Sequence, residues 1–211
     1  MPAARASRSH VALMIRTVLT HPVVMMLKRY AREVRWSIAG SGVRNPAIPR
    51  QVRSVLFVCL GNICRSPFGA LLAERLFREA GKGDIKCSSA GIRASQAARS
   101  PADAVAAARS YGIRLDDHVP RQLLRDLVAA HDVVMVMEAS QQQQLQATYP
   151  EFRDRFLLLP LLDDSPAGAY ERCNLPDPFG QPIEVFEACY ARIDRVLRRW
   201  VSAVNPIERS A

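Results

Sequence analysis

The chain has 211 residues, 49% of them hydrophobic, which suffices for one well-buried domain with some chain to spare. Ten of the 29 basic residues but only one of the 20 acidic residues lie before position 54, so this segment carries the whole net charge of +9. The remainder is neutral, which argues against a nucleic-acid-binding domain there.

Residues 1–50 form a basic extension whose apolar run, over 11–26, is interrupted by Arg16 and by His21-Pro22. The uninterrupted parts are too short to cross a bilayer, which needs about 20 apolar residues. A secretory signal peptide is not predicted either, because Arg16 lies within the would-be apolar core and no small-residue cleavage site clearly follows.

From position 23 onward, apolar residues recur at helical spacing and basic residues oppose them. The pattern predicts an amphipathic helix, and peripheral contact with a membrane or a partner through residues 11–38 is one interpretation. A disordered leader and a misassigned start codon, with Met25 or Met26 as the true start, are the alternatives. Residues 40–49 are typical of a linker. The apolar positions are Val23, Met26, Leu27, Tyr30 and Val34, and the basic positions are Lys28, Arg29, Arg32 and Arg35.

The stretch over 55–67, VLFVCLGNICRSP, combines a strand, a tight loop and the start of a helix. Residues 55–58 predict a buried strand, and Gly61-Asn62 predicts a turn that tolerates positive φ. Ser66 and Pro67 predict the N-cap and the first turn of a helix. Loop amides that converge at a helix N-terminus suit a phosphate group.

Cys59 and Arg65 flank this loop at a separation that lets both reach one phosphoryl group. Arg65 offers a planar fork for two phosphate oxygens, and Cys59 beside it should ionise readily and attack phosphorus. Ser66 can donate a hydrogen bond to that thiolate. Five cysteines without regular spacing exclude a disulfide framework and indicate the reducing, cytoplasmic setting that a thiolate requires. The alternative is a buried structural cysteine before a turn, which the agreement of all these signals disfavours.

The rest of the chain alternates predicted strands with predicted helices, which implies a parallel sheet covered on both faces. Cys59 then falls at the carboxyl end of a strand, where such sheets bind ligands. Leu71 is expected on the core side of its helix, and Arg192 is expected to face solvent. Further strands are predicted over 84–89, 132–137 and 155–159, and helices over 70–80, 102–110, 121–130, 139–148 and 184–204.

The motif VCLGNICRSP over 58–67 resembles the signature loop of the low-molecular-weight protein tyrosine phosphatases. The resemblance continues with SSAG over 88–91, DHVPRQL over 117–123 and PDPF over 176–179. It implies one three-layer α/β domain over 51–205, with a four-stranded parallel sheet, after the basic extension and before a tail over 206–211. It also points to the bacterial exopolysaccharide branch of the family.

Within that resemblance, Asp177 is the candidate general acid, because flanking prolines stiffen its loop and aim its carboxyl group. Phe179 can stack on a substrate ring. The sequence departs from many relatives, because Gly180 replaces a second aromatic residue and residues 92–95 contain none. The expected substrate-binding residues are Leu60, Gly61, Asn62, Ile63, Cys64, Ser66 and Phe179.

Ser89 and His118 are assigned by the resemblance to a hydrogen-bond network that holds Asn62 in its strained conformation. His131 lacks such a context and is expected to be structural. Cys64 is a candidate for a reversible disulfide with Cys59. No cofactor is expected, and no cluster of His, Cys and Asp has the spacing of a metal site.

Competing functions remain open on the same fold. An arsenate reductase needs further cysteines for a disulfide relay, and only Cys173 is placed to supply one. A protein-arginine phosphatase typically has Thr where this chain has Ile63, which favours phosphotyrosine as the substrate. A non-catalytic phosphotyrosine-binding module would not need Cys59, Arg65 and Asp177 together, so the presence of all three favours an enzyme. The sequence therefore predicts a cytoplasmic phosphotyrosine phosphatase, whose partner is a phosphotyrosine protein such as a membrane tyrosine autokinase.

Overall fold

The structure is a computed structural model that describes residues 22–166 and 168–206. It divides into two units, and the first includes α2 (Pro22–Ala39), η1 (Gly40–Gly42) and residues 168–170. The second unit comprises residues 43–166 and 171–206 among those described. The predicted contact segment over 11–38 is therefore covered only from residue 22, and residues 11–21 lie outside the described part.

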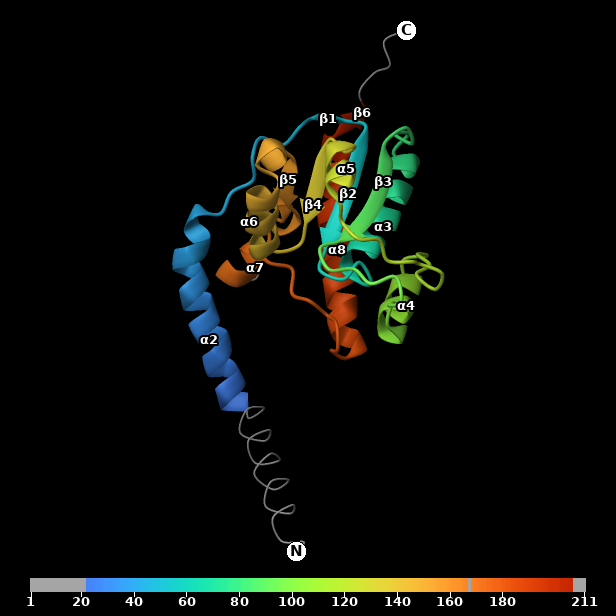
Figure 1. Cartoon of the computed structure of the whole chain (residues 1–211). Helices are drawn as coiled ribbons and strands as arrows, with labels where there is room; N and C mark the ends of the chain where they lie inside the picture. The colour runs from blue at the N-terminus through green and yellow to red at the C-terminus, as the bar shows by residue number, and fades with distance from the viewer. Residues whose placement is uncertain (1–21, 167, 207–211) are drawn as a thin grey trace, which may run out of the picture. The chain divides into compact units, whose positions relative to one another are not determined.

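The second unit is built on a four-stranded parallel sheet, as predicted (Figure 1). Its spatial order is β3-β2-β4-β5, so β2 lies in the interior of the sheet. Strand β2 ends at Cys59, in the loop over 59–65 that we call the nucleophile loop. Every residue of β4 is buried, which is typical of a strand covered on both faces. The strands are β2 (Ser54–Cys59), β3 (Lys86–Gly91), β4 (Val133–Val136) and β5 (Phe156–Leu158).

Helices cover both faces of this sheet (Figure 1). The predicted helix over 121–130 is shorter than expected, since its first residues form loop and one isolated bridge, at Gln122. The helices of this unit are α3 (Arg65–Glu79), α4 (Ala102–Arg109), α5 (Arg125–Ala129), α6 (Ala139–Thr148) and α8 (Ile183–Ala203), with the short helices η2 (Pro150–Arg155) and η3 (Leu159–Leu162). A further short helix, α7 (Ala169–Cys173), runs from the first unit into the second.

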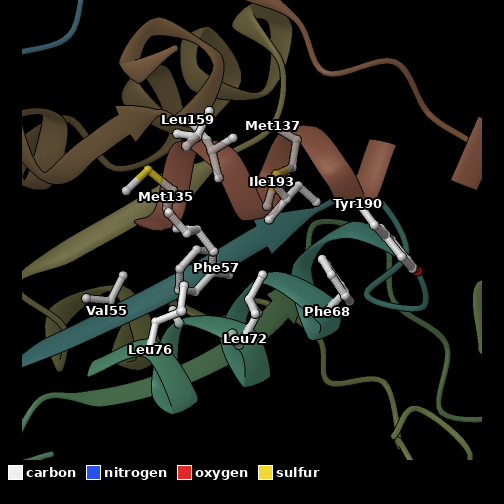
Figure 2. Packing of buried hydrophobic residues seen from close by; sticks show 14 of the residues in the cluster. Val55, Phe57, Phe68, Leu72, Leu76, Met135, Met137, Leu159, Tyr190 and Ile193 are labelled. Carbon is white, nitrogen blue, oxygen red and sulfur yellow. The ribbon is translucent and has the colours of Figure 1, made fainter. Parts of the chain in front are cut away.

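One face of the sheet packs on α3 and α8 and forms the main core (Figure 2). Phe57 and Met135 project from neighbouring strands toward both helices. Near the loop that follows β2, Phe68 of α3 stacks on Tyr190 of α8, with ring centroids 3.8 Å apart. The Tyr190 hydroxyl donates to the Cys64 carbonyl oxygen at 3.3 Å, so α8 supports the nucleophile loop directly.

The other face of the sheet presents the alternate side chains of the same strands, including Leu56, Val58 and Val134, all fully buried. Helix α6 packs here against β4 and β5. Alternation along each strand thus divides the apolar residues between two layers, which is the physical reason for the three-layer architecture.

The chain before β2 belongs to the second unit from residue 43, so the predicted linker over 40–49 is not merely a spacer. Asn45 binds the backbone of the edge strand β5: its Oδ1 accepts from Leu158 N at 2.6 Å and its Nδ2 donates to Leu158 O at 3.2 Å. An amide side chain thereby satisfies backbone groups that an edge strand leaves open. Beyond it, β1 (Gln51–Val52) pairs in parallel with β6 (Asn205–Pro206).

Three local expectations are wrong. Helix α3 begins at Arg65 with Cys64 at the N-cap and no side-chain cap, so Ser66 lies inside the first turn. Leu71 is 37% exposed because the neighbouring positions Ala70 and Leu72 supply the buried face. Arg192 is buried, since an acidic partner and two carbonyl groups bind it within the fold.

Among the described residues, no helix has the length and apolar character that a bilayer span requires.

Candidate active site

The Sγ atom of Cys59 lies at the carboxyl end of β2, where the loop over 59–65 leads directly into α3. Cys59 is 3% exposed. Asn62 N donates to its Sγ at 3.3 Å, and Ser66 Oγ lies 3.1 Å from the same sulfur. Against a thiolate the hydroxyl is the donor, so two hydrogen bonds and a helix N-terminus stabilise negative charge at this atom.

Asn62 adopts positive φ, at 55°, and a network of hydrogen bonds holds it there. Its Nδ2 donates to Ser66 Oγ and to Ser89 Oγ, each at 2.9 Å, while Arg121 N donates to its Oδ1 at 2.8 Å. The His118 ring approaches the Asn62 carbonyl oxygen through Nε2 at 2.8 Å. The structure thus brings together Ser89, His118 and Asn62 as the resemblance implied, and four contacts over-determine a strained residue.

The surroundings of His118 favour its neutral form. Burial lowers the pKa of His118 from its ordinary value of 6.5, and the hydrogen bond to Asn62 opposes that shift only in part. A neutral ring that contacts a carbonyl oxygen through Nε2 must carry its proton on Nε2, so the bond fixes the tautomer.

Glycine is required at position 91 rather than 61. Gly61 does not adopt positive φ, contrary to expectation, because Asn62 alone makes the reversal in this loop. At Gly91, a Cβ atom would lie 2.9 Å from Leu60 O, from the Gly61 carbonyl carbon and from Asn62 N. The end of β3 therefore approaches the nucleophile loop so closely that only glycine fits, a requirement that sequence reasoning did not identify.

Arg65 is 1% exposed and its guanidinium is held by two carboxylates. Nη1 donates to Glu138 Oε1 at 2.6 Å and to Leu175 O at 2.8 Å, and Nη2 lies 2.7 Å from Asp177 Oδ2. Burial favours the neutral form of Arg65, but negative charge at Cys59, Asp177 and Glu138 raises its pKa overall. The buried Nε has no hydrogen-bond partner among the described residues, which leaves one donor available to an anion.

Glu138 is a further residue of the site that sequence reasoning missed. It follows β4 and therefore lies at the same edge of the sheet as Cys59. Gln141 Nε2 donates to Glu138 Oε1 at 3.1 Å and helps to orient it. A carboxylate after a buried strand was a usable signal, because carboxyl ends of parallel strands meet at one edge.

Cys59, Arg65 and Asp177 line a cavity of about 210 Å³. Phe179 at its rim is 60% exposed and Leu60 is 44% exposed, which places apolar surface beside the reactive sulfur. Asn62 and Ser66, also predicted to bind substrate, are fully buried, and their side chains are hydrogen-bonded to each other within the loop. The lining residues are Cys59, Leu60, Gly61, Ile63, Cys64, Arg65, Arg93, Asp177 and Phe179.

The second cysteine of the loop, Cys64, lies in surroundings that disfavour its thiolate. Burial, followed by the charges at Cys59 and Asp177, raises the pKa of Cys64, so Cys64 remains a thiol. Burial likewise raises the pKa of Cys173, which is fully buried and does not line the cavity. Cys59 is therefore the nucleophile candidate of this site.

Over residues 22–166 and 168–206, no group of three or more His, Cys, Asp and Glu side chains could hold a metal ion. His131 lies away from the cavity lining and bonds Ser88 Oγ at 2.8 Å and Leu127 O at 2.6 Å. The arrangement can therefore bind a tetrahedral anion between loop amides and Arg65, attack it with Cys59, and supply a carboxyl group from Asp177.

Comparison with known proteins finds a matching family. The family model for low molecular weight phosphotyrosine protein phosphatases matches residues 54–209. The low molecular weight protein-tyrosine-phosphatase Wzb of Escherichia coli (strain K12) is 32% identical over 152 residues, which are 72% of this chain and 95% of that protein.

Two solved structures extend the comparison. The tyrosine phosphatase AmsI of Erwinia amylovora has a TM-score of 0.64 at 29% identity, and the match covers 76% of this chain and 99% of that one. The YwlE arginine phosphatase, solved as a cysteine-to-serine mutant with a phosphorylated active-site serine, has a TM-score of 0.63 at 26% identity, and the match covers 71% of this chain and 93% of that one.

Proposed function

Because the chain belongs to the low molecular weight phosphotyrosine protein phosphatase family, we propose that it hydrolyses phosphotyrosine in proteins through a phosphocysteine at Cys59. One observation carries this proposal. Arg65 is fully buried at the cavity wall beside the sulfur, and its Nε lacks a partner among the described residues. A buried, unpaired donor is costly unless a ligand satisfies it, and a phosphoryl oxygen is the natural acceptor.

In the first step the Cys59 thiolate attacks phosphorus. The Sγ–P bond forms, the P–O bond to the tyrosine ring breaks, and protonated Asp177 gives its proton to the leaving phenolate oxygen. Loop amides and Arg65 stabilise the charge that develops on the equatorial oxygens. An anion bound at Arg65 Nε and Nη2 takes the place of Asp177 at Nη2, which frees the carboxyl group for the leaving oxygen.

In the second step water attacks the phosphocysteine. The new P–O bond forms, the Sγ–P bond breaks, and Asp177 accepts the proton that water loses. The Ser66 hydroxyl, 3.1 Å from Sγ, then stabilises the thiolate as it leaves. The phosphorylated active-site serine of YwlE supports a covalent route in that relative.

The primary test is steady-state hydrolysis of p-nitrophenyl phosphate. We expect the Cys59→Ser variant to be inactive and the Asp177→Asn variant to lose about 10²- to 10⁴-fold in kcat with phenyl phosphate. The loss should be smaller with p-nitrophenyl phosphate, because its leaving group needs less protonation. Full activity of Cys59→Ser would refute the mechanism.

Phosphoarginine is the alternative substrate, since both tyrosine and arginine phosphatases are among the similar structures. Ile63 in the cavity lining favours the flat phosphotyrosine ring, as do the exposed Leu60 and Phe179. A comparison of kcat/KM for matched phosphotyrosine and phosphoarginine peptides decides between them.

Arsenate reduction is disfavoured because Cys173 is buried away from the cavity. A purely binding role is disfavoured because nucleophile, guanidinium and acid are all present.

We also propose that α2 holds the enzyme at an anionic membrane surface from the cytoplasmic side, where a membrane tyrosine autokinase of exopolysaccharide export would be its substrate. Within its own unit, Arg32 lies over the Tyr170 ring at 4.1 Å, and Glu33 Oε2 accepts from Tyr170 N at 3.1 Å. The apolar side of the helix is left exposed, with Met26, Leu27, Tyr30, Val34 and Ile38 each at least 45% accessible. Basic residues beside an exposed apolar stripe match an anionic lipid surface.

Co-sedimentation of the full chain with vesicles containing anionic lipid tests this attachment. We expect Val34→Asp to weaken binding strongly, because it places a charge within the apolar stripe. Ser41→Asp adds the same charge after the helix and is the matched control. Equal binding of both variants and the unchanged chain would refute membrane attachment through α2.

A further inference from the structure

Arg93 is fixed at the mouth of the active site by the nucleophile loop itself. Its backbone N–H donates to Leu60 O at 2.8 Å, and Ile92 N donates to Cys59 O at 3.0 Å. These bonds continue the β2–β3 pairing past Gly91, so the backbone of residue 93 is registered against the loop that holds the sulfur.

A second pair of hydrogen bonds holds the same segment. Gln122 Nε2 donates to Ile92 O at 2.9 Å, and Ala94 N donates to Gln122 Oε1 at 3.0 Å. The backbone on both sides of Arg93 is therefore hydrogen-bonded to fixed elements. Its position at the cavity is set by the fold rather than by a free loop.

Arg93 lines the cavity together with Arg65, Asp177 and Phe179. Some exposed arginines of this unit, such as Arg109 with Asp116, have acidic partners. Over residues 22–166 and 168–206, no acidic side chain forms an ion pair with Arg93, and Asp177 is engaged by Arg65. Arg93 is thus a cation beside the phosphoryl site without an acidic partner in the described part of the chain.

We propose that Arg93 forms an anion subsite that binds an acidic group of the substrate next to the phosphotyrosine, either a carboxylate or a second phosphate. The inference rests on the proposed phosphotyrosine phosphatase function and adds a preference among its substrates. Arg65 and the loop amides take the scissile phosphoryl group, and Phe179 and Leu60 flank the ring. The guanidinium fork of Arg93 then meets a neighbouring group, and its geometry matches carboxylate and phosphate alike.

The expected gain is modest for a carboxylate and larger for a phosphate. An exposed ion pair is worth up to about a fivefold change in binding. A phosphate carries more charge and more acceptor oxygens, so we expect about tenfold or more. Because Arg93 is not at the reacting atoms, the effect should appear in KM and leave kcat for a given peptide nearly unchanged.

The test uses the full-length chain and three phosphotyrosine peptides that differ at one neighbouring position, which is Ala, Glu or a second phosphotyrosine. The measured quantity is the ratio of kcat/KM for each acidic peptide to that for the Ala peptide, within each enzyme variant. We expect Arg93→Gln to bring the ratio to about one and Arg93→Glu to reverse the preference. Arg99→Gln is the control, because Arg99 lies in the same loop but donates to Gln96 O and Ala98 O and does not line the cavity.

The arms of the experiment separate the sources of the anion. A preference for Glu that Arg93→Gln abolishes assigns a carboxylate, and a preference confined to the doubly phosphorylated peptide assigns a phosphate. The subsite would be overturned if the unchanged enzyme had the same kcat/KM for the acidic peptides as for the Ala peptide. It would also be overturned if a preference for an acidic peptide survived Arg93→Gln.

A binding measurement keeps the proposed function and the subsite distinguishable. Peptide affinities of the Cys59→Ala variant, which has no nucleophile at this position, must show the same order with Arg93 present and lose it with Arg93→Gln. If the unchanged enzyme fails to hydrolyse p-nitrophenyl phosphate, the proposed function fails, while the order of affinities still supports or overturns the subsite.

Discussion

Arg192 of α8 should be a main contributor to stability, because its buried guanidinium joins three separate groups. Nε donates to Asp163 Oδ2 at 2.7 Å, Nη1 to Asn174 O at 3.1 Å and Nη2 to Glu171 O at 2.6 Å. Asp163 also receives Arg195 Nη2 at 2.8 Å. The network connects α8 to the segment that precedes the loop carrying Asp177.

The Arg192→Met substitution keeps the apolar stem and removes every donor. Loss of one partner of a buried ion pair costs about 3–5 kcal/mol, because the other charge stays buried. Arg195 remains at Asp163 but is half exposed and supports the carboxylate less. We therefore expect the free energy of unfolding to fall by about 3 kcal/mol, toward the lower end of that range.

The assay is urea unfolding at pH 7, with Arg198→Met as the control. Arg198 pairs with Asp194 one helical turn away on the same helix, and it is 55% exposed. Such a pair is worth only about 0.3–0.5 kcal/mol. If Arg192→Met costs no more than Arg198→Met, the buried network does not stabilise the fold and the reasoning fails.

The difference should also depend on pH. Burial opposes ionisation of Asp163, but the hydrogen bonds from Arg195 and Arg192 outweigh it and lower the pKa of Asp163 below its ordinary value of 3.8. A carboxyl group whose pKa is lowered by folding stabilises the fold at pH values above its pKa in the unfolded chain. This stabilisation is lost as the pH falls through its pKa in the folded chain. The gap between the unchanged chain and Arg192→Met should therefore narrow below about pH 4. A constant gap down to about pH 2 would contradict the pairing.

Three further outcomes follow from the site. Gly91→Ala should cost about 1–3 kcal/mol in urea unfolding and depress turnover, because a Cβ would meet the nucleophile-loop backbone at 2.9 Å; an unchanged variant would refute the contact. Glu138→Ala should lower kcat/KM about 10- to 100-fold by releasing Arg65, whereas Glu138→Gln, which still offers an acceptor, should lose less; equal losses would exclude an aiming role. The pKa of His118 is lowered in the folded chain, so as the pH falls the unfolded chain takes up a proton at this residue before the folded chain does. The free energy of unfolding should therefore decline as the pH falls below 6.5. If the free energy of unfolding of a His118→Gln variant has the same slope against pH between about pH 7.5 and 5.5, this expectation is contradicted.

The sequence by itself determined the local unit that carries the chemistry. A buried strand, a turn residue with positive φ and a helix start follow one another within about a dozen positions, so short-range preferences fix where Cys59 and Arg65 stand. The alternation of strands and helices likewise specified the parallel sheet, since hydrophobic periodicity is a local property of each element.

Only the tertiary structure decided which distant groups complete the site. Glu138 reaches Arg65 across 73 positions, and Gly91 matters because β3 lies against the nucleophile loop. Arg192 was expected in solvent, but Asp163 and two carbonyl groups from other segments surround it. The physical reason is that such contacts depend on which elements meet in space, whereas a sequence pattern reports only which face of a single element is apolar.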